Sequence, residues 1–179
     1  MVTADVSARL AWPDDAASIA RVQLDAWRDL YADVIAPDVL DSLDVDVFAE
    51  RWSESLAKPQ DARMRVLVAL DRADVRGFAL VQPSLDPDAD QIADGEIGEF
   101  VVDPAHRGEG HGSRLLQAAM DTLAADRFTR ARWWIASTDD ALREFVTSSG
   151  WEADGAHREL QDDAGHTVKQ VRLHSSLTA

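Results

Sequence analysis

The spacing of apolar and polar positions along the N-terminal part of the chain predicts one strand followed by helices. Residues 6–13 have the pattern of a strand, and Asp14 or Asp15 can cap the helix that follows. The apolar side chains of this helix fall on one face, at Ile19, Val22, Leu24 and Trp27. After a break at Pro37, residues 45–56 again follow a helical period.

Runs of β-branched residues in the middle of the chain predict three strands. Residues 64–71 and 75–83 are separated by a short turn, which is typical of a hairpin. An acidic loop at 83–95 leads into a third strand at 96–102. Beyond it, apolar residues fall on one helical face, at Leu115, Leu116, Ala119, Met120 and Leu123.

The C-terminal part of the chain returns to alternating strands and helices. We predict a strand at 131–137, a short helix at 139–151 and two weaker strands near 153–160 and 167–174. This order of elements defines a mixed α/β fold in which helices pack on a central sheet. Neither a repeat nor a linker divides the chain, so we expect a single domain over residues 1–179.

The residue composition excludes several kinds of chemistry. The chain has no cysteine, which excludes disulfides, thiolate nucleophiles and cysteine-ligated zinc, and its five histidines show no metal-site spacing. We therefore expect no metal. The N-terminus lacks the features of a signal peptide, and no apolar run approaches the ~20 residues that span a bilayer. We therefore expect a cytoplasmic protein.

The charge balance limits the partners. Against 33 acidic residues the chain has 18 basic ones, a net charge of −15. Such a field repels nucleic acid and anionic membranes and favours cationic small molecules. An acidic surface that only keeps the protein soluble is the alternative explanation. Charge thus argues against nucleic acid and membrane partners without naming a substrate.

Three glycines at alternate positions, Gly108, Gly110 and Gly112, separate the third strand from the next helix. A strand that turns into a helix in this way presents free N–H groups and the positive end of the helix dipole, which bind phosphate. Glycines let the phosphate approach the main chain, and Arg107 and Arg114 add positive charge. The alternative is a tight turn that binds nothing.

Other phosphate loops match this segment less well. Ser113 stands where G-x-G-x-x-G requires glycine, and the chain has no Gly-Lys-Ser/Thr of a P-loop. Residues 107–112, RGEGHG, are preceded by VDP and followed at 115–116 by LL. This segment resembles the acyl-CoA signature of the GNAT-type N-acetyltransferase superfamily.

The resemblance extends over nearly the whole chain. Residues 95–104, GEIGEFVVDP, are similar to the strand that precedes the signature in a bacterial branch of the family, and AWRDLY at 26–31 resembles a further segment. Residues 139–151 resemble the family's Asn-x-x-Ala-x-x-Phe-Tyr helix. Two positions depart from it: Asp139 replaces the asparagine and Val146 replaces the tyrosine that commonly serves as general acid.

The resemblance implies a GNAT-like fold with acetyl-CoA as acyl donor. In that fold a mixed, mostly antiparallel central sheet carries helices on both faces, and an acyl-CoA cleft opens where the third strand and the strand at 131–137 splay. The positions that the resemblance places at the cofactor are Phe100, Val101, Val102, Arg107, Gly108, Glu109, Gly110, His111, Gly112, Ser113 and Asp139.

An amine acceptor is protonated at neutral pH, so a base must remove a proton before the amine attacks the thioester. The resemblance favours Glu96 for this role, and Glu99 is the alternative. Alternation along the strand puts the two glutamates on opposite faces, unless a bulge intervenes. We therefore expect one of them to face the cleft.

The general acid is open because Val146 cannot donate a proton. Tyr31 is the only tyrosine in the chain and the only phenol that could substitute. Packing or substrate contact is its alternative role, and water or direct departure of the thiolate is the alternative route. Trp27, one helical turn earlier, either lines the acceptor pocket with Tyr31 or packs on the sheet.

The sequence thus predicts an N-acyltransferase that moves an acetyl group from acetyl-CoA to a primary amine by direct attack in a ternary complex. We expect a cationic small-molecule or peptide amine as acceptor, in a pocket formed by 26–58 and 83–95, and consider a homodimer on symmetry grounds. The alternative is a non-catalytic acyl-CoA-binding sensor or pseudoenzyme of the same fold.

Overall fold

The computed structural model describes residues 6–178 of the chain. Its elements, in chain order, are β1 (Val6–Leu10), the 3-10 turn η1 (Pro13–Asp15), α1 (Ala16–Leu30), α2 (Pro37–Asp41), α3 (Val45–Ala57), β2 (Arg65–Asp71), β3 (Asp74–Pro83), β4 (Asp94–Val102), the 3-10 turn η2 (Pro104–His106), α4 (His111–Ala125), β5 (Arg130–Ala136), α5 (Asp140–Ser148), β6 (Glu152–Gln161) and β7 (Thr167–Ser176). None of the described helices is long and apolar enough to cross a membrane.

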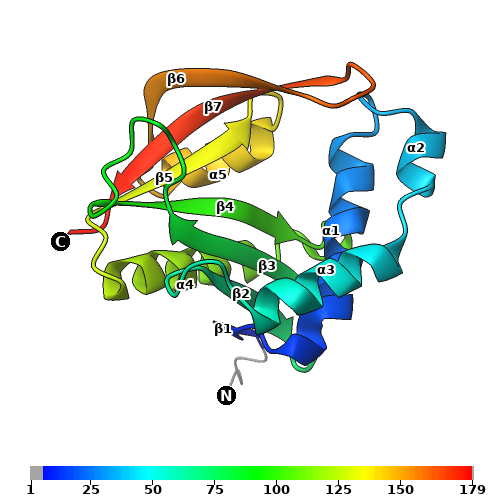
Figure 1. Ribbon diagram of the computed structural model, residues 1–179, viewed down its shortest axis with the longest axis horizontal. Coiled ribbons are helices and arrows are strands. Elements are labelled where there is room, and N and C mark those ends of the chain that lie inside the picture. Colours follow the sequence, from blue (N-terminus) through cyan, green and yellow to red (C-terminus); the bar gives the residue numbers. More distant parts are fainter. Residues whose placement is uncertain (1–5, 179) are drawn as a thin grey trace.

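The strands form one seven-stranded sheet in the order β1-β2-β3-β4-β5-β7-β6 (Figure 1). Every neighbouring pair is antiparallel except β4 and β5, which are parallel. A parallel pair needs a crossover connection, and α4 provides it. The predicted mixed, mostly antiparallel sheet is confirmed.

Helices bury both faces of the sheet, as predicted. On one face, which we call the α1 face, Ile19 and Val22 of α1 pack against Phe78 of β3, and side chains of α3 join them. On the opposite α4 face, Leu115 of α4 and Val146 of α5 are fully buried. Full burial of one such side chain contributes about 1.5–3 kcal/mol. The apolar stripes seen in the sequence therefore fix which side each helix covers.

The two aspartates expected at helix starts behave differently. Asp139 caps α5, since its carboxylate accepts a hydrogen bond from the Leu142 amide. Asp15 precedes α1, but its carboxylate accepts from the Trp12 amide and pairs with Arg9. The side-chain cap considered at Asp15 is therefore not formed, because the bend before the helix takes up its oxygens.

The third predicted strand, β4, begins at Asp94 and not at Glu96. The Asp94 carboxylate is fully buried, accepts hydrogen bonds from Arg130 and forms an ion pair with Arg132. Both arginines lie on β5. A buried charge is tolerated when it is paired, so an acidic residue that is typical of a loop continues the sheet here.

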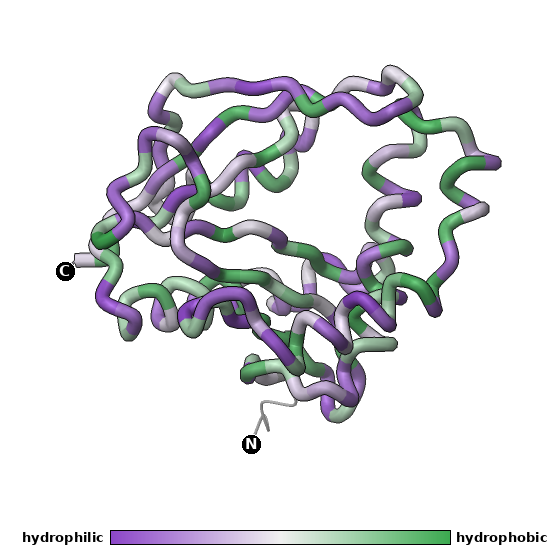
Figure 2. Tube along the Cα trace, viewed as in Figure 1, coloured by the Kyte–Doolittle hydropathy of each residue, from purple (hydrophilic) through white to green (hydrophobic). Residues whose placement is uncertain are grey.

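Strand β6 lies at the outer edge of the sheet, and almost all of its residues are exposed. Figure 2 shows that it is mostly hydrophilic along its length, in contrast to the apolar positions of the central strands. Polar edges of this kind resist unwanted strand pairing.

Candidate active site

The central strands β4 and β5 separate after four paired positions. Parallel pairing runs from Asp94 with Arg130 to Ile97 with Trp133, and beyond it β4 pairs with β3 and β5 pairs with β7. In the described sheet, main-chain groups of β4 from Gly98 onward therefore lack a strand partner on the β5 side. The strands splay as predicted. We call this gap in main-chain pairing between β4 and β5 the cleft, and α4 and α5 follow its two arms along the chain.

Aromatic side chains fill the α4 face beneath the point of separation. The rings of Phe100 on β4 and Trp133 on β5 are 4.8 Å apart between centroids, and Trp151 packs on Trp133 at 5.6 Å. Trp133 is buried in this cluster, whereas Trp134 points to the α1 face. The two tryptophans therefore point to opposite faces, as expected.

The three glycines of the turn before α4 have different structural needs. Gly108 and Gly110 have φ angles of +80° and +87°, a region that side chains disfavour. Gly112 is helical, and a Cβ there would meet only Val102 and Phe145 at 3.7 and 3.8 Å, which are ordinary contacts. A tight turn therefore explains the first two glycines but not the third. The structure itself thus does not require a glycine at position 112.

Charged side chains surround this turn. Arg107 forms an ion pair of 2.7 Å with Asp29 at the end of α1. Glu109 accepts from His106, and this contact holds the pKa of the Glu109 carboxyl below its usual value. His111 is 1% exposed, with Nε2 3.4 Å from Glu109. Its Nδ1 has no hydrogen-bond partner among the described residues.

Glu96 and Glu99 lie on the same face of β4. Leu80 of β3 pairs with Glu99, but its neighbour Val81 pairs with Ile97, so Gly98 is an extra residue in a bulge. The bulge resets the alternation and turns both glutamates toward the α1 face. The placement on opposite faces, expected for a strand without a bulge, is therefore not found, because β4 is not regular.

The Glu96 carboxylate is buried and saturated with hydrogen bonds. It accepts from Gln82 Nε2 at 2.9 Å, from Ser84 Oγ at 3.1 Å and from the Leu85 amide at 3.1 Å. The residue is 9% exposed. The three donors come from Gln82 at the end of β3 and from the two residues that follow the strand. Glu96 thus ties the start of the acidic loop to β4.

Glu99 has the opposite environment. It is partly buried, and burial raises the pKa of its carboxyl to about 7. Burial raises the pKa of Tyr31 as well, and the charges of Glu99 and Asp139 raise it further. Charges from both arms of the cleft, on β4 and at the start of α5, therefore act on Tyr31. Its neighbour Trp27 packs at 5.5 Å against Phe48 of α3.

An ion-pair network fixes the acidic loop after β3 on the α1 face. Arg172 of β7 donates to Asp86 and Asp88, and Arg132 of β5 also donates to Asp88. These hydrogen bonds, chiefly from Arg172, hold the pKa of Asp88 well below its usual value. The Trp134 indole donates to Asp86 at 2.9 Å. The loop is therefore anchored beside the separation of β4 and β5.

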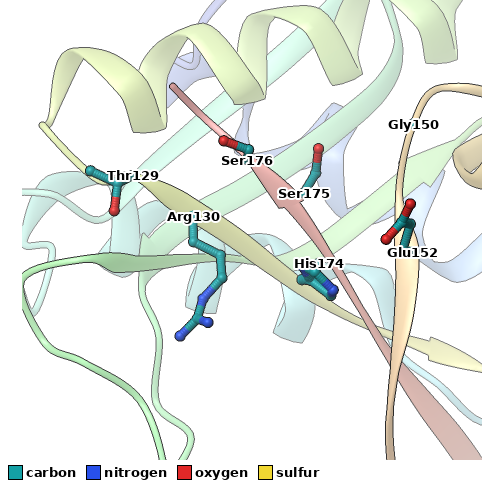
Figure 3. A pocket seen from close by; sticks show the side chains of 7 residues that line it. All are labelled: Thr129, Arg130, Gly150, Glu152, His174, Ser175 and Ser176. Carbon is teal, nitrogen blue, oxygen red and sulfur yellow. The ribbon is translucent and has the colours of Figure 1, made fainter. Parts of the chain in front are cut away.

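A hollow of about 370 Å³ lies at the other end of β5, away from the mouth of the cleft (Figure 3). Its lining residues come from β5, β6, β7 and the segments that precede β5 and β6: Thr129, Arg130, Gly150, Glu152, His174, Ser175 and Ser176. The Arg130 guanidinium is already paired with Asp94. The hollow therefore contributes nothing to the cleft.

Among the described residues, no group of three or more His, Asp or Glu side chains could hold a metal ion. Val146, at the position of the family tyrosine, is fully buried on the α4 face. Sequence reasoning missed Gln82 and Ser84 as partners of Glu96 and Asp29 as the partner of Arg107. These contacts join segments far apart in the chain, and no local pattern marks them.

The site combines a splayed parallel strand pair with a glycine turn at a helix N-terminus and with carboxylates beside the cleft. This combination is typical of transferases that bind acyl-CoA. The model of the Acetyltransferase (GNAT) family matches residues 24–151, more than half of the chain. The protein therefore belongs to the GNAT acetyltransferase family.

Known proteins of similar sequence and structure agree with this assignment. The uncharacterized N-acetyltransferase YuaI of Bacillus subtilis is 28% identical over 169 residues, covering 94% of this chain and 91% of that protein. The structure of yncA from Salmonella typhimurium, with its cofactor acetyl-CoA, has a TM-score of 0.70 at 20% identity and covers 97% of this chain and 95% of that one. PaiA N-acetyltransferase from Thermoplasma acidophilum, in complex with coenzyme A, has a TM-score of 0.71 at 13% identity, with coverages of 96% and 98%.

Proposed function

We propose that the protein is an acetyl-CoA-dependent N-acetyltransferase that acetylates a primary amine by direct attack in a ternary complex. The observation that carries the proposal is the cleft itself, which has a glycine turn beyond one arm and a desolvated carboxylate, Glu99, on its α1 face. Acetyl-CoA supplies an acetyl group that is activated as a thioester.

The residues of the β4 arm and of the turn fit the acyl donor. Main-chain groups from Phe100 to Val102, which lack a partner on the β5 side, can pair with a pantetheine arm as with another strand. The free amides at the start of α4 suit a pyrophosphate, and the absence of a side chain at Gly112 lets it approach them. Arg107 and Arg114 offset part of the net charge of −15, which opposes an anionic donor.

Glu99 is the residue that we propose as general base. A base works best when its pKa is near the operating pH, and burial raises the pKa of Glu99 to about 7. The favoured position from the resemblance, Glu96, is instead engaged by three donors. We propose that Glu96 positions the loop and β4, and that Glu99 takes the proton from the acceptor ammonium.

Tyr31 is the proposed proton donor to the leaving thiolate. Its raised pKa keeps the phenol protonated at neutral pH, and the charges of Glu99 and Asp139, on the two arms of the cleft, act on it. The acceptor ammonium loses two protons as it becomes an amide. Glu99 takes the first, and the Tyr31 phenolate, left after the phenol has protonated the thiolate, takes the second. Loss of the Glu99 proton to solvent then restores the site.

The test combines binding with turnover. Calorimetry should show stoichiometric acetyl-CoA binding, and release of free thiol should depend on added amine across a panel of amines, amino acids and peptides. Tight binding with no amine-dependent thiol release from any acceptor would instead identify a sensor of the same fold. The absence of acetyl-CoA binding would contradict both.

A further inference from the structure

The guanidinium of Arg158, on the edge strand β6, is held in a fixed position without a carboxylate in contact. It stacks over the Trp134 ring, with Cζ 4.3 Å from the ring centroid. Its Nε donates to Gln170 of β7 at 2.8 Å. No ion pair of Arg158 is found among the described residues. The two terminal nitrogens of the guanidinium therefore have N–H donors to offer.

Arg158 is exposed, and it differs from the arginines beside it in having no ion pair. The chain has 33 acidic residues for 18 basic ones, and the nearby arginines Arg132 and Arg172 each have carboxylate partners. The negative charges of Asp86 and Glu96 act on Arg158, but both carboxylates are engaged elsewhere. Desolvation lowers the pKa of the Arg158 guanidinium.

The position of Arg158 excludes the phosphates of the donor as its partner. On β5, Trp134 comes directly after Trp133, the last residue that pairs with β4, and it points to the α1 face. Arg158 stacks on Trp134, so it lies beside the point where β4 and β5 separate. Gly112, at the phosphate turn, faces Val102 at the far end of β4 on the α4 face. Val102 lies five residues beyond Ile97, or ~16 Å along a strand. An anion that reaches Arg158 therefore enters from the acceptor side.

We infer that Arg158 binds the carboxylate or another oxyanion of the acceptor, so that the acceptor is an amine that also carries a negative group, as an amino acid does. This inference rests on the proposed function. The planar fork of arginine matches a carboxylate with two parallel hydrogen bonds, and the Trp134 ring and Gln170 pre-orient it. Glu99 lies on the same α1 face, and the proposed function assigns the ammonium end to it. A zwitterion fits this arrangement, whereas a diamine leaves Arg158 unpaired.

The experiment compares matched acceptors that differ only in the negative group. The probes are the common α-amino acids, each paired with its α-carboxamide, together with the diamines putrescine and cadaverine, assayed by thiol release. The variants are Arg158→Gln, which removes the charge, and Arg158→Lys, which keeps the charge but loses the fork. Lys169→Gln on β7 is the control, because it removes one positive charge from an exposed side chain near the same edge.

We expect the best amino acid to exceed its carboxamide in kcat/KM by about 10–100-fold, the range for one charge-assisted hydrogen-bond pair. Arg158→Gln should remove this preference by raising KM for the acid, and Arg158→Lys should recover part of it. The KM for acetyl-CoA and the rate with the carboxamide should stay unchanged. Equal rates for acid and carboxamide, a preference for diamines, or equal losses in Arg158→Gln and Lys169→Gln would overturn the inference.

A binding measurement separates this inference from the proposed function. In the presence of CoA, calorimetry compares an N-acetyl amino acid with its N-acetyl carboxamide on the wild type and on Arg158→Gln. If no acceptor supports turnover, the proposed function fails. Binding of the N-acetyl amino acid that depends on Arg158 would then still support the oxyanion site. If binding of this acid did not depend on Arg158, the inference would be overturned.

Discussion

Glu96 and Glu99 project from the same face of β4, although they are three residues apart, because the bulge at Gly98 lies between them. Their environments separate their chemistry. Three donors hold Glu96 in place, whereas burial without such donors raises the pKa of Glu99 to about 7. One carboxylate therefore organises the strand and the loop, and the other is able to exchange a proton near neutral pH.

The first prediction compares the two glutamates. Glu99→Gln keeps the shape of the side chain but removes the base, so kcat/KM for the acceptor should fall by ~10²–10⁴-fold. In the wild type, kcat/KM should rise with pH up to about 7, where the Glu99 carboxylate forms, and Glu99→Gln should lack this limb. Glu96→Gln should retain the limb. Acceptor kinetics from pH 5 to 9 measure both. A retained limb in Glu99→Gln would assign the base to another group.

The second prediction concerns stability. The pKa of Glu99 is raised in the folded state, so the folded protein binds its proton more tightly than the unfolded chain does. The free energy of unfolding should therefore decrease as pH rises from about 4.5 to about 7 on account of this group. Glu99→Gln does not ionise, so it should be more stable than the wild type at pH 8. Denaturation by urea at pH 4.5 and 8 tests the sign, and a Glu99→Gln protein that is less stable at pH 8 would contradict it.

The third prediction uses the difference among the glycines. Gly112→Val should raise the Kd for acetyl-CoA at least about tenfold in the folded protein, because its side chain occupies the approach of a phosphate to the amides at the start of α4. Gly150→Ala is the control. Gly150 has a φ of +90°, and a methyl group at this position would have no neighbour within 4 Å, so this change should lower Tm and leave Kd unchanged. Unaltered acetyl-CoA binding by a folded Gly112→Val protein would disprove the phosphate site.

The fourth prediction concerns the ion pair between Arg107 and Asp29. Asp29→Asn frees the arginine and removes a negative charge beside the phosphate turn, so the Kd for acetyl-CoA should decrease a few-fold at low ionic strength. Arg107→Gln should increase it. Both effects should shrink in about 0.5 M salt, because these side chains are exposed. Weaker binding in Asp29→Asn would mean that the pair orders the turn more than it competes with phosphate.

The fifth prediction tests Tyr31 as proton donor. Tyr31→Phe preserves the ring contact with Trp27 and removes only the hydroxyl. If the phenol donates the proton, turnover should fall with acetyl-CoA binding unchanged. The wild-type rate should decline only above pH 10, since the pKa of Tyr31 is raised above its usual value, and the variant should lack this decline. The same kcat and pH profile in Tyr31→Phe would leave water or direct departure of the thiolate.

The sequence predicts most of the fold because the spacing of apolar residues shows which positions are buried. This spacing differs between helices and strands and can be read from a short segment. The face of α4 at Leu115 and Leu123 and the strand at Trp133 follow from this rule. The bulge at Gly98 does not, because a glycine in a strand is compatible with regular pairing as well. The anchoring of the acidic loop by Arg172 also escapes prediction, since its partner Asp86 is 86 residues away.

The candidate site is predictable in part for the same reason. The turn around Gly110 is a contiguous motif with a physical rationale, so a single segment reveals it. Glu99, Tyr31 and Arg158 come from three elements that only the folded sheet brings near the cleft. Their relative importance depends on burial and hydrogen bonding, which spacing along the chain does not encode.

The early end of pairing between β4 and β5, at Ile97 and Trp133, leaves the middle of the sheet incomplete. A donor molecule that pairs with the free edge of β4 finishes the sheet and adds its binding energy to folding. At a donor concentration 100 times the Kd, this amounts to about 2.7 kcal/mol, a large part of the stability of an ordinary domain. The lifetime of the protein in the cell should then follow the supply of its own donor, so that a fall in acetyl-CoA removes the enzyme as well as its substrate.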